Sequence, residues 1–142
     1  MPIASVAEVS GPLKLVYRIP GVRDNGGAVN VGITTVAICT SYSDIPEKME
    51  FSVYEYDGTQ KGQLLKASIS PSGSLTMVTH GTNVYLADAF FATGVVVGGH
   101  MFIRSSTPKV VCTAMVLDAS AAAPSGVALH SVRHNSPAGV QE

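Results

Sequence analysis

Residues 48–57, KMEFSVYEYD, alternate between apolar and polar side chains. The apolar members are Met49, Phe51 and Val53, and the polar members are Glu50, Ser52 and Tyr54. A period of two places successive side chains on opposite faces of a β-strand, so this stretch predicts a strand with one buried face. Asp57 and Gly58 form a turn signal, and residues 62–70, GQLLKASIS, alternate again. The sequence therefore predicts a β-hairpin.

Similar alternation, or a short apolar run bounded by turn residues, recurs along most of the chain. The further predicted strands cover residues 13–19, 33–44, 75–80, 94–106, 109–118 and 125–134. Within residues 94–106, one face is predicted to carry Val95, Val97, Met101 and Ile103, and the other His100, Phe102 and Arg104.

The number and spacing of these strands indicate the fold class. No window of a dozen residues shows the apolar spacing of a helix. About eight or nine short strands without alternating helices are typical of an all-β, antiparallel two-sheet β-sandwich with little or no helix. At 142 residues we expect a single domain over residues 1–142, with flexible ends at about 1–10 and 135–142.

Charge is scarce in this chain. Charged residues make up 13% of the sequence, hydrophobic residues make up 46%, and the net charge is −1. The basic residues are scattered along the sequence, so we do not expect nucleic-acid binding. No apolar stretch reaches the roughly 18 residues that a transmembrane helix needs. The first ten residues show no signal peptide, so we expect an extracellular or periplasmic protein if a signal has been removed, and otherwise a cytoplasmic one.

The two cysteines, Cys39 and Cys112, each precede a threonine and lie in the two most apolar predicted strands. If these strands belong to facing sheets, an inter-sheet disulfide would contribute about 4 kcal/mol by the loop-entropy model. The alternatives are two buried free thiols or a reactive or metal-binding pair. The apolar neighbours of both cysteines argue against a reactive pair, because a nucleophilic thiolate needs an accessible, electropositive setting.

The histidines give no metal motif. His130 and His134 have the i, i+4 spacing that binds zinc on a helix, but they lie in a predicted strand, where four residues span about 13 Å. His100 follows two glycines in an apolar strand. It is interpreted as a half-buried side chain with satisfied hydrogen bonds, the alternative being a residue that lines a cleft.

Tyr54 and Tyr56 are on the opposite side of the first hairpin strand from its predicted buried face, so they are predicted to face solvent or a partner. Ordinary cross-strand packing on a sheet surface is the alternative. Together with His100, these tyrosines form the contact surface that the sequence suggests.

Four stretches carry a resemblance to known proteins: VNVGITTVAICTSYSD (29–44), YDGTQKGQLL (56–65), GHMFIRSSTPKVVCTAMVLD (99–118) and VALHSVRH (127–134). Over roughly residues 28–134 the chain resembles small, uncharacterised bacterial β-sandwich proteins that are often exported. The resemblance implies an immunoglobulin-like sandwich and carries over no catalytic or ligand-binding residue. This chain departs from that group because it has no visible export signal.

No nucleophile, base and orienting group can be assembled from the sequence, so we expect a non-enzymatic protein with no cofactor and no metal. The first hypothesis is a structural or binding module, possibly at a cell surface, that contacts protein or glycan through its sheet faces or loops. The alternative is a subunit that assembles into a homo-oligomer, as in a phage or a mobile element. An enzyme of unknown type is the third hypothesis.

Overall fold

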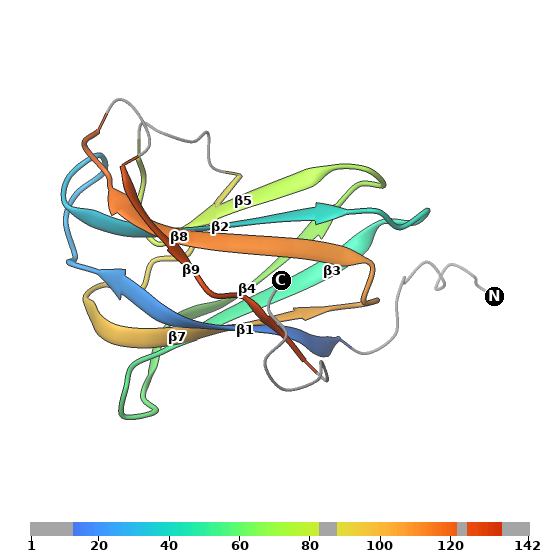
Figure 1. The fold of residues 1–142 in the computed structure, drawn as a ribbon, viewed down its shortest axis with the longest axis horizontal. Helices are drawn as coiled ribbons and strands as arrows, with labels where there is room; N and C mark the ends of the chain where they lie inside the picture. The colour runs from blue at the N-terminus through green and yellow to red at the C-terminus, as the bar shows by residue number, and fades with distance from the viewer. Residues whose placement is uncertain (1–12, 83–87, 122–124, 135–142) are drawn as a thin grey trace.

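The computed structural model describes residues 13–82, 88–121 and 125–134, with the backbone but not the side chains of residues 63–66. Within them the chain forms ten β-strands and no helix (Figure 1). The strands are β1 Lys14–Asp24, β2 Ile33–Ser41, β3 Glu47–Tyr54, β4 Gln60–Ile69, β5 Ser74–Val78, β6 Ala89–Phe90, β7 Val96–Ser105, β8 Val110–Asp118, β9 Gly126–Leu129 and β10 Val132–Arg133. The flexible ends expected at about 1–10 and 135–142 lie outside the described residues.

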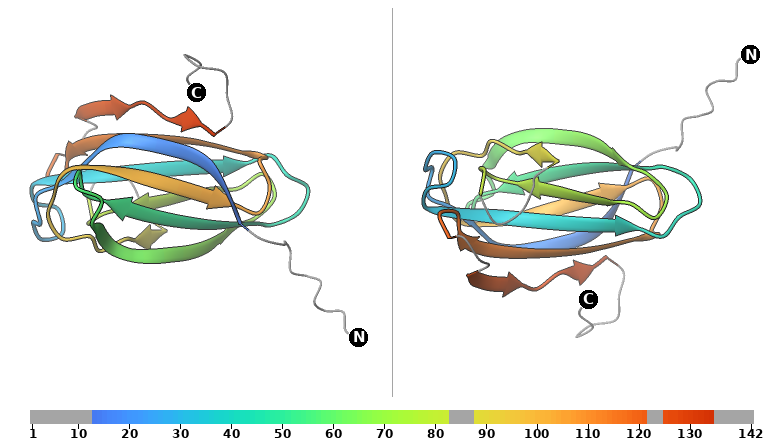
Figure 2. Two further views of the ribbon diagram at one scale, coloured as in Figure 1. Left: turned by 90° about the horizontal axis from the view of Figure 1, so that it is seen from below. Right: turned by 90° about the horizontal axis from the view of Figure 1, so that it is seen from above.

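The strands form two five-stranded sheets that pack face to face. Sheet A has the order β10-β1-β7-β3-β4, and sheet B has the order β6-β5-β2-β8-β9. Sheet B is the upper layer in Figure 1, and Figure 2 looks onto sheet A from below and onto sheet B from above. Neighbouring strands run antiparallel, except that β5 and β6 are parallel. The all-β, two-sheet prediction is confirmed.

The core lies between the inner faces of the two sheets. Met49, Phe51 and Val53 are fully buried there, as the alternation in β3 predicts. The other large side chains of the core include Tyr17, Ile19, Met77, Met101 and Ile103. A second, smaller apolar cluster, Val36, Val78 and Leu117, lies on the outer side of sheet B, because these residues alternate with core residues in their strands.

The prediction for the start of β7 is wrong. Val95 and Val97 are 49% and 60% exposed, while Val96 is buried. Gly99 pairs with Val22 and Val96 pairs with Asp24, so the register between β1 and β7 shifts here. A shift of one residue exchanges the two faces of a strand, which places Val96 instead of its neighbours in the core.

The last predicted strand, 125–134, is two strands. β9 pairs with β8 in sheet B, and β10 pairs with β1 in sheet A, so the chain crosses from one sheet to the other at His130 and Ser131. This division and the two-residue strand β6 account for ten strands where about eight or nine were expected.

The condition of facing sheets, on which an inter-sheet disulfide depends, is not met. β2 and β8 are neighbours in sheet B, and Cys39 and Cys112 are directly opposite each other in their register. Their side chains form a disulfide with a Cα–Cα distance of 4.1 Å. Directly opposed residues of an antiparallel pair are close enough for this bond without any contribution from the second sheet.

Candidate binding surface

Three rings lie close together on the outer face of sheet A, each in contact with the other two, and we call Tyr54, His100 and Phe102 the aromatic row. The Tyr54 and His100 rings are stacked, with centroids 5.7 Å apart and an interplanar angle of 13°. Phe102 lies 5.0 Å from His100 and 5.6 Å from Tyr54, tilted against both. All three side chains are half-buried. The three rings meet because Tyr54 of β3 is opposite His100 of β7 in the register. Phe102 follows His100 by two residues and lies on the same face of β7.

Charged side chains lie beside Phe102. The Arg104 guanidinium carbon lies 5.8 Å from the centroid of the Phe102 ring. Arg18 of β1 is opposite Phe102 in the register, and Ser52 of β3 is opposite it on the other side. The Ser52 hydroxyl is buried and has no hydrogen-bond partner among the described residues. The face therefore combines ring surfaces with groups that can form hydrogen bonds.

The structure brings together two of the three contact residues that the sequence suggested. Tyr54 and His100 are stacked, but Tyr56 lies beyond the end of β3, is 76% exposed and is outside the row. Phe102 was assigned to the same strand face as His100 but was not part of the suggested contact surface. The signal that identifies it is its position two residues after His100, on the same side of the strand.

The basic residues, scattered in the sequence, are gathered by the fold. The strands of sheet A carry eight of the nine lysines and arginines, namely Lys14, Arg18, Arg23, Lys48, Lys61, Lys66, Arg104 and Arg133. The ninth, Lys109, precedes β8, and the five strands of sheet B contain none. The two sheets therefore present chemically different surfaces.

A groove of about 740 Å³ lies at the end of sheet A where β1 begins and β7 ends. Its basic groups belong to Lys14, Arg133 and His134, and we call it the cationic groove. Leu15, Val16 and Pro108 form an apolar wall, and residues 105–107 contribute hydroxyl groups. The volume is within the range of small-ligand sites.

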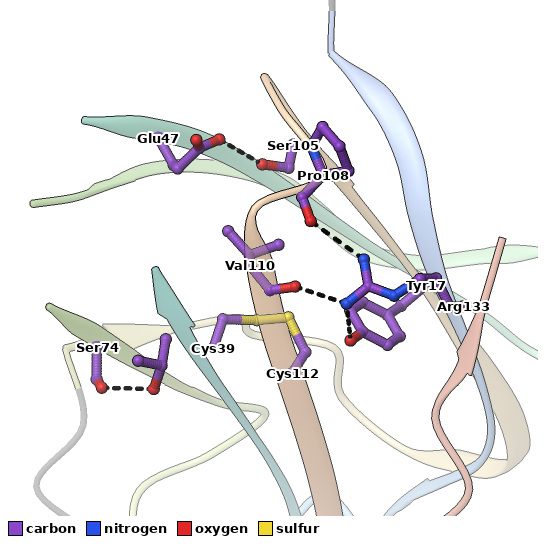
Figure 3. The surroundings of a disulfide bond; sticks show 10 residues. Tyr17, Cys39, Glu47, Ser74, Ser105, Pro108, Val110, Cys112 and Arg133 are labelled. Atoms are coloured by element: carbon purple, nitrogen blue, oxygen red, sulfur yellow. Dashed lines mark hydrogen bonds between the residues drawn. A yellow bond between two sulfur atoms is a disulfide. The ribbon is translucent and has the colours of Figure 1, made fainter. Parts of the chain in front are cut away.

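Arg133 is held firmly at this groove (Figure 3). Its guanidinium donates hydrogen bonds to the carbonyl oxygens of Pro108 and Val110 and to the Tyr17 hydroxyl, at 2.7 to 3.1 Å. It also lies over the Tyr17 ring, 4.7 Å from the centroid. β8, which carries Cys112 of the disulfide, is thus tied to β10 of the other sheet.

Glu47 is a fully buried carboxylate at the start of β3. It accepts hydrogen bonds from the hydroxyls of Ser105, Ser106 and Thr107 and from the Thr107 amide. Burial raises the pKa of this carboxyl, but these hydrogen bonds together outweigh it and leave the pKa below its ordinary value. Glu47 therefore fixes the turn between β7 and β8.

Glu55 has a similar role at the other end of β3. Its carboxylate accepts hydrogen bonds from the Val97 and Gly98 amides, each at 2.9 Å. These two bonds hold the pKa of Glu55 below its usual range. Because the side chain turns toward β7, it supports the register shift that exposes Val97.

Asp24 and His80 form a pair that resembles part of a catalytic triad. His80 Nδ1 lies 2.6 Å from Asp24 Oδ2, and the Thr79 hydroxyl donates to the same oxygen. However, His80 Nε2 donates to the Val31 carbonyl at 2.7 Å. In a triad that nitrogen takes the proton of the nucleophile, so here the pair fastens the loop after β1 to the end of β5. No local sequence pattern marks this pair, because its two residues are 56 positions apart in the chain.

No group of three or more histidine, cysteine, aspartate or glutamate side chains suited to a metal ion occurs in the described part of the chain. None of the described residues belongs to a helix that is long and apolar enough to cross a membrane.

Comparison with known proteins informs only the fold. No protein-family model matches the chain, and no curated protein matches it. Among solved structures the chain is similar to the crystal structure of Thermotoga maritima 1070, with a TM-score of 0.53 and 15% sequence identity. The similarity covers 87% of this chain and 93% of that chain. At this identity the likeness supports the architecture and says nothing of function.

Proposed function

We propose that this protein is a non-enzymatic binding module that contacts a glycan through the outer face of sheet A. The observation that carries the proposal is the aromatic row, in which Tyr54 and His100 are stacked and Phe102 extends the ring surface. The C–H faces of sugar rings pack on aromatic side chains, whose apolar bodies and polar tips suit a partly hydrated contact. Arg104 and Arg18 lie within reach to hydrogen-bond sugar hydroxyls.

A glycan fits this face better than a protein does. Lys48 and Glu50 alternate with core residues of β3 and therefore lie on the same face as the row. The centres of protein–protein interfaces are depleted in lysine and glutamate. Hydrated polar groups around a few rings are compatible with a sugar chain, which is itself polar.

The disulfide supports a location outside the cytosol. Disulfides persist in oxidising compartments such as the periplasm and the extracellular space. We accordingly propose an exported or surface-associated protein. We also propose that the sandwich is immunoglobulin-like, since two sheets, antiparallel apart from the β5–β6 pair, are joined by connections that cross between them, as from β2 to β3 and from β7 to β8.

A panel of labelled oligosaccharides, screened against the wild-type chain and single variants, tests the glycan proposal. Tyr54→Ala and Phe102→Ala should each weaken binding about tenfold, because each removes ring surface from the contact. Tyr56→Ala is the matched control, since it removes an exposed tyrosine outside the row. Failure of every oligosaccharide to bind, or equal binding by Phe102→Ala and wild type, would overturn the proposal.

Self-assembly through the outer face of sheet B is the second candidate. This face has no lysine or arginine in any of its strands, and Val111 on it is 47% exposed. Ile38 and Met115 are partly buried beside the Val36 cluster on the same face. A surface without lysine or arginine can meet its own copy in a twofold interface without repulsion between cations.

Sedimentation velocity over a wide concentration range tests the assembly candidate. The wild type should associate, and Val111→Lys should shift it to the monomer because a charge would be buried without a partner. Thr59→Lys, in the turn between β3 and β4, is the control for added charge alone. A wild-type protein that stays monomeric at high concentration would exclude this candidate.

A further inference from the structure

We propose that the glycan is acidic, and that its carboxylate or sulfate group enters the cationic groove while neutral sugar rings pack on the aromatic row. This inference rests on the proposed function. It is carried by Arg18, which is opposite Phe102 and contacts His134 of the groove, and by the groups that line the groove.

The groove offers donors for an anion. Lys14 is exposed at its rim, and the Arg133 guanidinium is fixed by three hydrogen bonds and by the Tyr17 ring. Among the described lining residues no side chain is a carboxylate. Because the Arg133 guanidinium is already ordered, it adds positive charge to the groove without a further loss of conformational freedom.

His134 contributes a further donor. Its Nδ1 lies 3.2 Å from Arg18 Nη2, and a guanidinium can only donate, so Nδ1 accepts this bond. The ring proton of the neutral imidazole is therefore on Nε2, where it can be donated to a ligand. The bond to Arg18 thus determines which nitrogen of His134 can donate.

The Glu47 carboxylate does not oppose this assignment. It is buried, and it accepts four hydrogen bonds from residues 105–107, which also line the groove. Those four donors satisfy both of its oxygens. The basic groups therefore remain the ones that a ligand meets.

Arg18 connects the groove to the aromatic row. It is opposite Phe102 in the β1–β7 register, and its guanidinium bonds to His134 of the groove. Opposed side chains in neighbouring strands lie roughly 5 Å apart at Cβ. A ligand that packs on Phe102 can therefore extend past Arg18 into the groove.

Charge is unequal along this combined surface. Arg18 and Arg104 lie beside Phe102, with Glu50 opposite Arg104 in the register, whereas the register neighbours of the other two rings, Pro20 and Gln60, are neutral. A nucleic acid carries a phosphate at every nucleotide and requires cations along its whole path. A sugar chain with an acidic group at one position matches the observed distribution better.

Fluorescence anisotropy with four labelled probes and the full chain tests this inference. The probes are a neutral maltohexaose, a hexagalacturonate with carboxylates, a sulfated heparin hexasaccharide and a single-stranded dodecanucleotide. Either acidic oligosaccharide should bind about tenfold more tightly than the neutral one at low salt, with the advantage falling as salt is added. The difference between the carboxylated and the sulfated probe identifies the anionic group.

Single substitutions in the groove show where the anionic group of the probe binds. Lys14→Ala and His134→Ala should each weaken binding of the acidic probe about fivefold and leave the neutral probe unchanged. Lys61→Ala, on β4 at the opposite edge of sheet A, is the matched control for loss of charge. Tyr54→Ala should weaken binding of both kinds of sugar.

The outcomes separate the two proposals. Equal binding of neutral and acidic sugars, with sensitivity to Tyr54→Ala alone, overturns the acidic-group assignment and leaves the glycan proposal standing. Absence of all sugar binding overturns both. Tighter binding of the dodecanucleotide than of the acidic sugars, weakened by Lys14→Ala, also overturns this inference and assigns the surface to a nucleic acid.

Discussion

The backbone of Gly99 lies so close to the carbonyl oxygen of Tyr54 that a Cβ on Gly99 would come within 3.0 Å of that oxygen. Gly99 immediately precedes His100, which stacks on the Tyr54 ring. The close approach of β7 to β3 and the stacking of the rings are therefore parts of one arrangement. A side chain at position 99 would have to separate the two strands beside the aromatic row.

Gly99→Ala should lower the free energy of unfolding by about 1 to 3 kcal/mol, the usual effect of overpacking, because a backbone carbonyl cannot move aside as a flexible side chain can. Urea denaturation measures this change. Gly98→Ala is the matched control, since a Cβ at that position would have no atom within 4 Å. Equal stability of the two variants would contradict the close approach.

Glu47→Gln should lower the free energy of unfolding at pH 7 by about 2 kcal/mol or more, since an amide cannot accept all the hydrogen bonds that reach the carboxylate. The pKa of Glu47 is lowered in the folded protein. The stabilisation is therefore fully present above the pKa that Glu47 has in the unfolded chain. It is lost as the pH falls through the pKa that Glu47 has in the folded protein.

Urea denaturation of the wild type and Glu47→Gln at a series of pH values from 7 to 3 checks this dependence. The two stability curves should converge as the pH falls. Asp44→Asn removes an exposed carboxylate from the neighbouring loop and should follow the wild type throughout. A constant difference between wild type and Glu47→Gln at all pH values would show that the carboxylate charge is not the cause.

Loss of the Cys39–Cys112 bond should lower the free energy of unfolding by about 4 kcal/mol, because the bond closes a loop across a sequence separation of 73 residues. Denaturation with and without reductant measures the change. The double variant Cys39→Ala with Cys112→Ala should not respond to reductant. Two free thiols in denatured, unreduced protein would refute the disulfide.

His80→Ala should loosen the loop between β1 and β2, because Val31 would lose the donor to its carbonyl and Asp24 would lose a partner. The Asn30 amide, which donates to the Gly81 carbonyl, should then exchange its hydrogen faster. Hydrogen-exchange mass spectrometry measures this protection. His130→Ala changes an exposed histidine and should leave the loop protected; equal protection in both variants would contradict the role of His80.

The candidate site was only partly accessible from the sequence. Tyr54 and His100 could be assigned to outer strand faces from local alternation, but their stacking depends on the β3–β7 register, between strands far apart in the chain. Tyr56 shares the same alternation, yet it lies outside the row because β3 ends at Tyr54. Alternation predicts which face a residue takes, but not where its strand ends or which strand it meets.

The sequence by itself determined the all-β class, the hairpin face of Met49, Phe51 and Val53, and the presence of two sheets, because a period of two is a local property of the chain. Only the tertiary structure placed Cys39 opposite Cys112 in one sheet, gathered eight of the nine basic residues on the other, and joined Arg18 to His134. These features arise from pairings between distant strands. Such pairings follow from packing of the whole core, which no local pattern encodes.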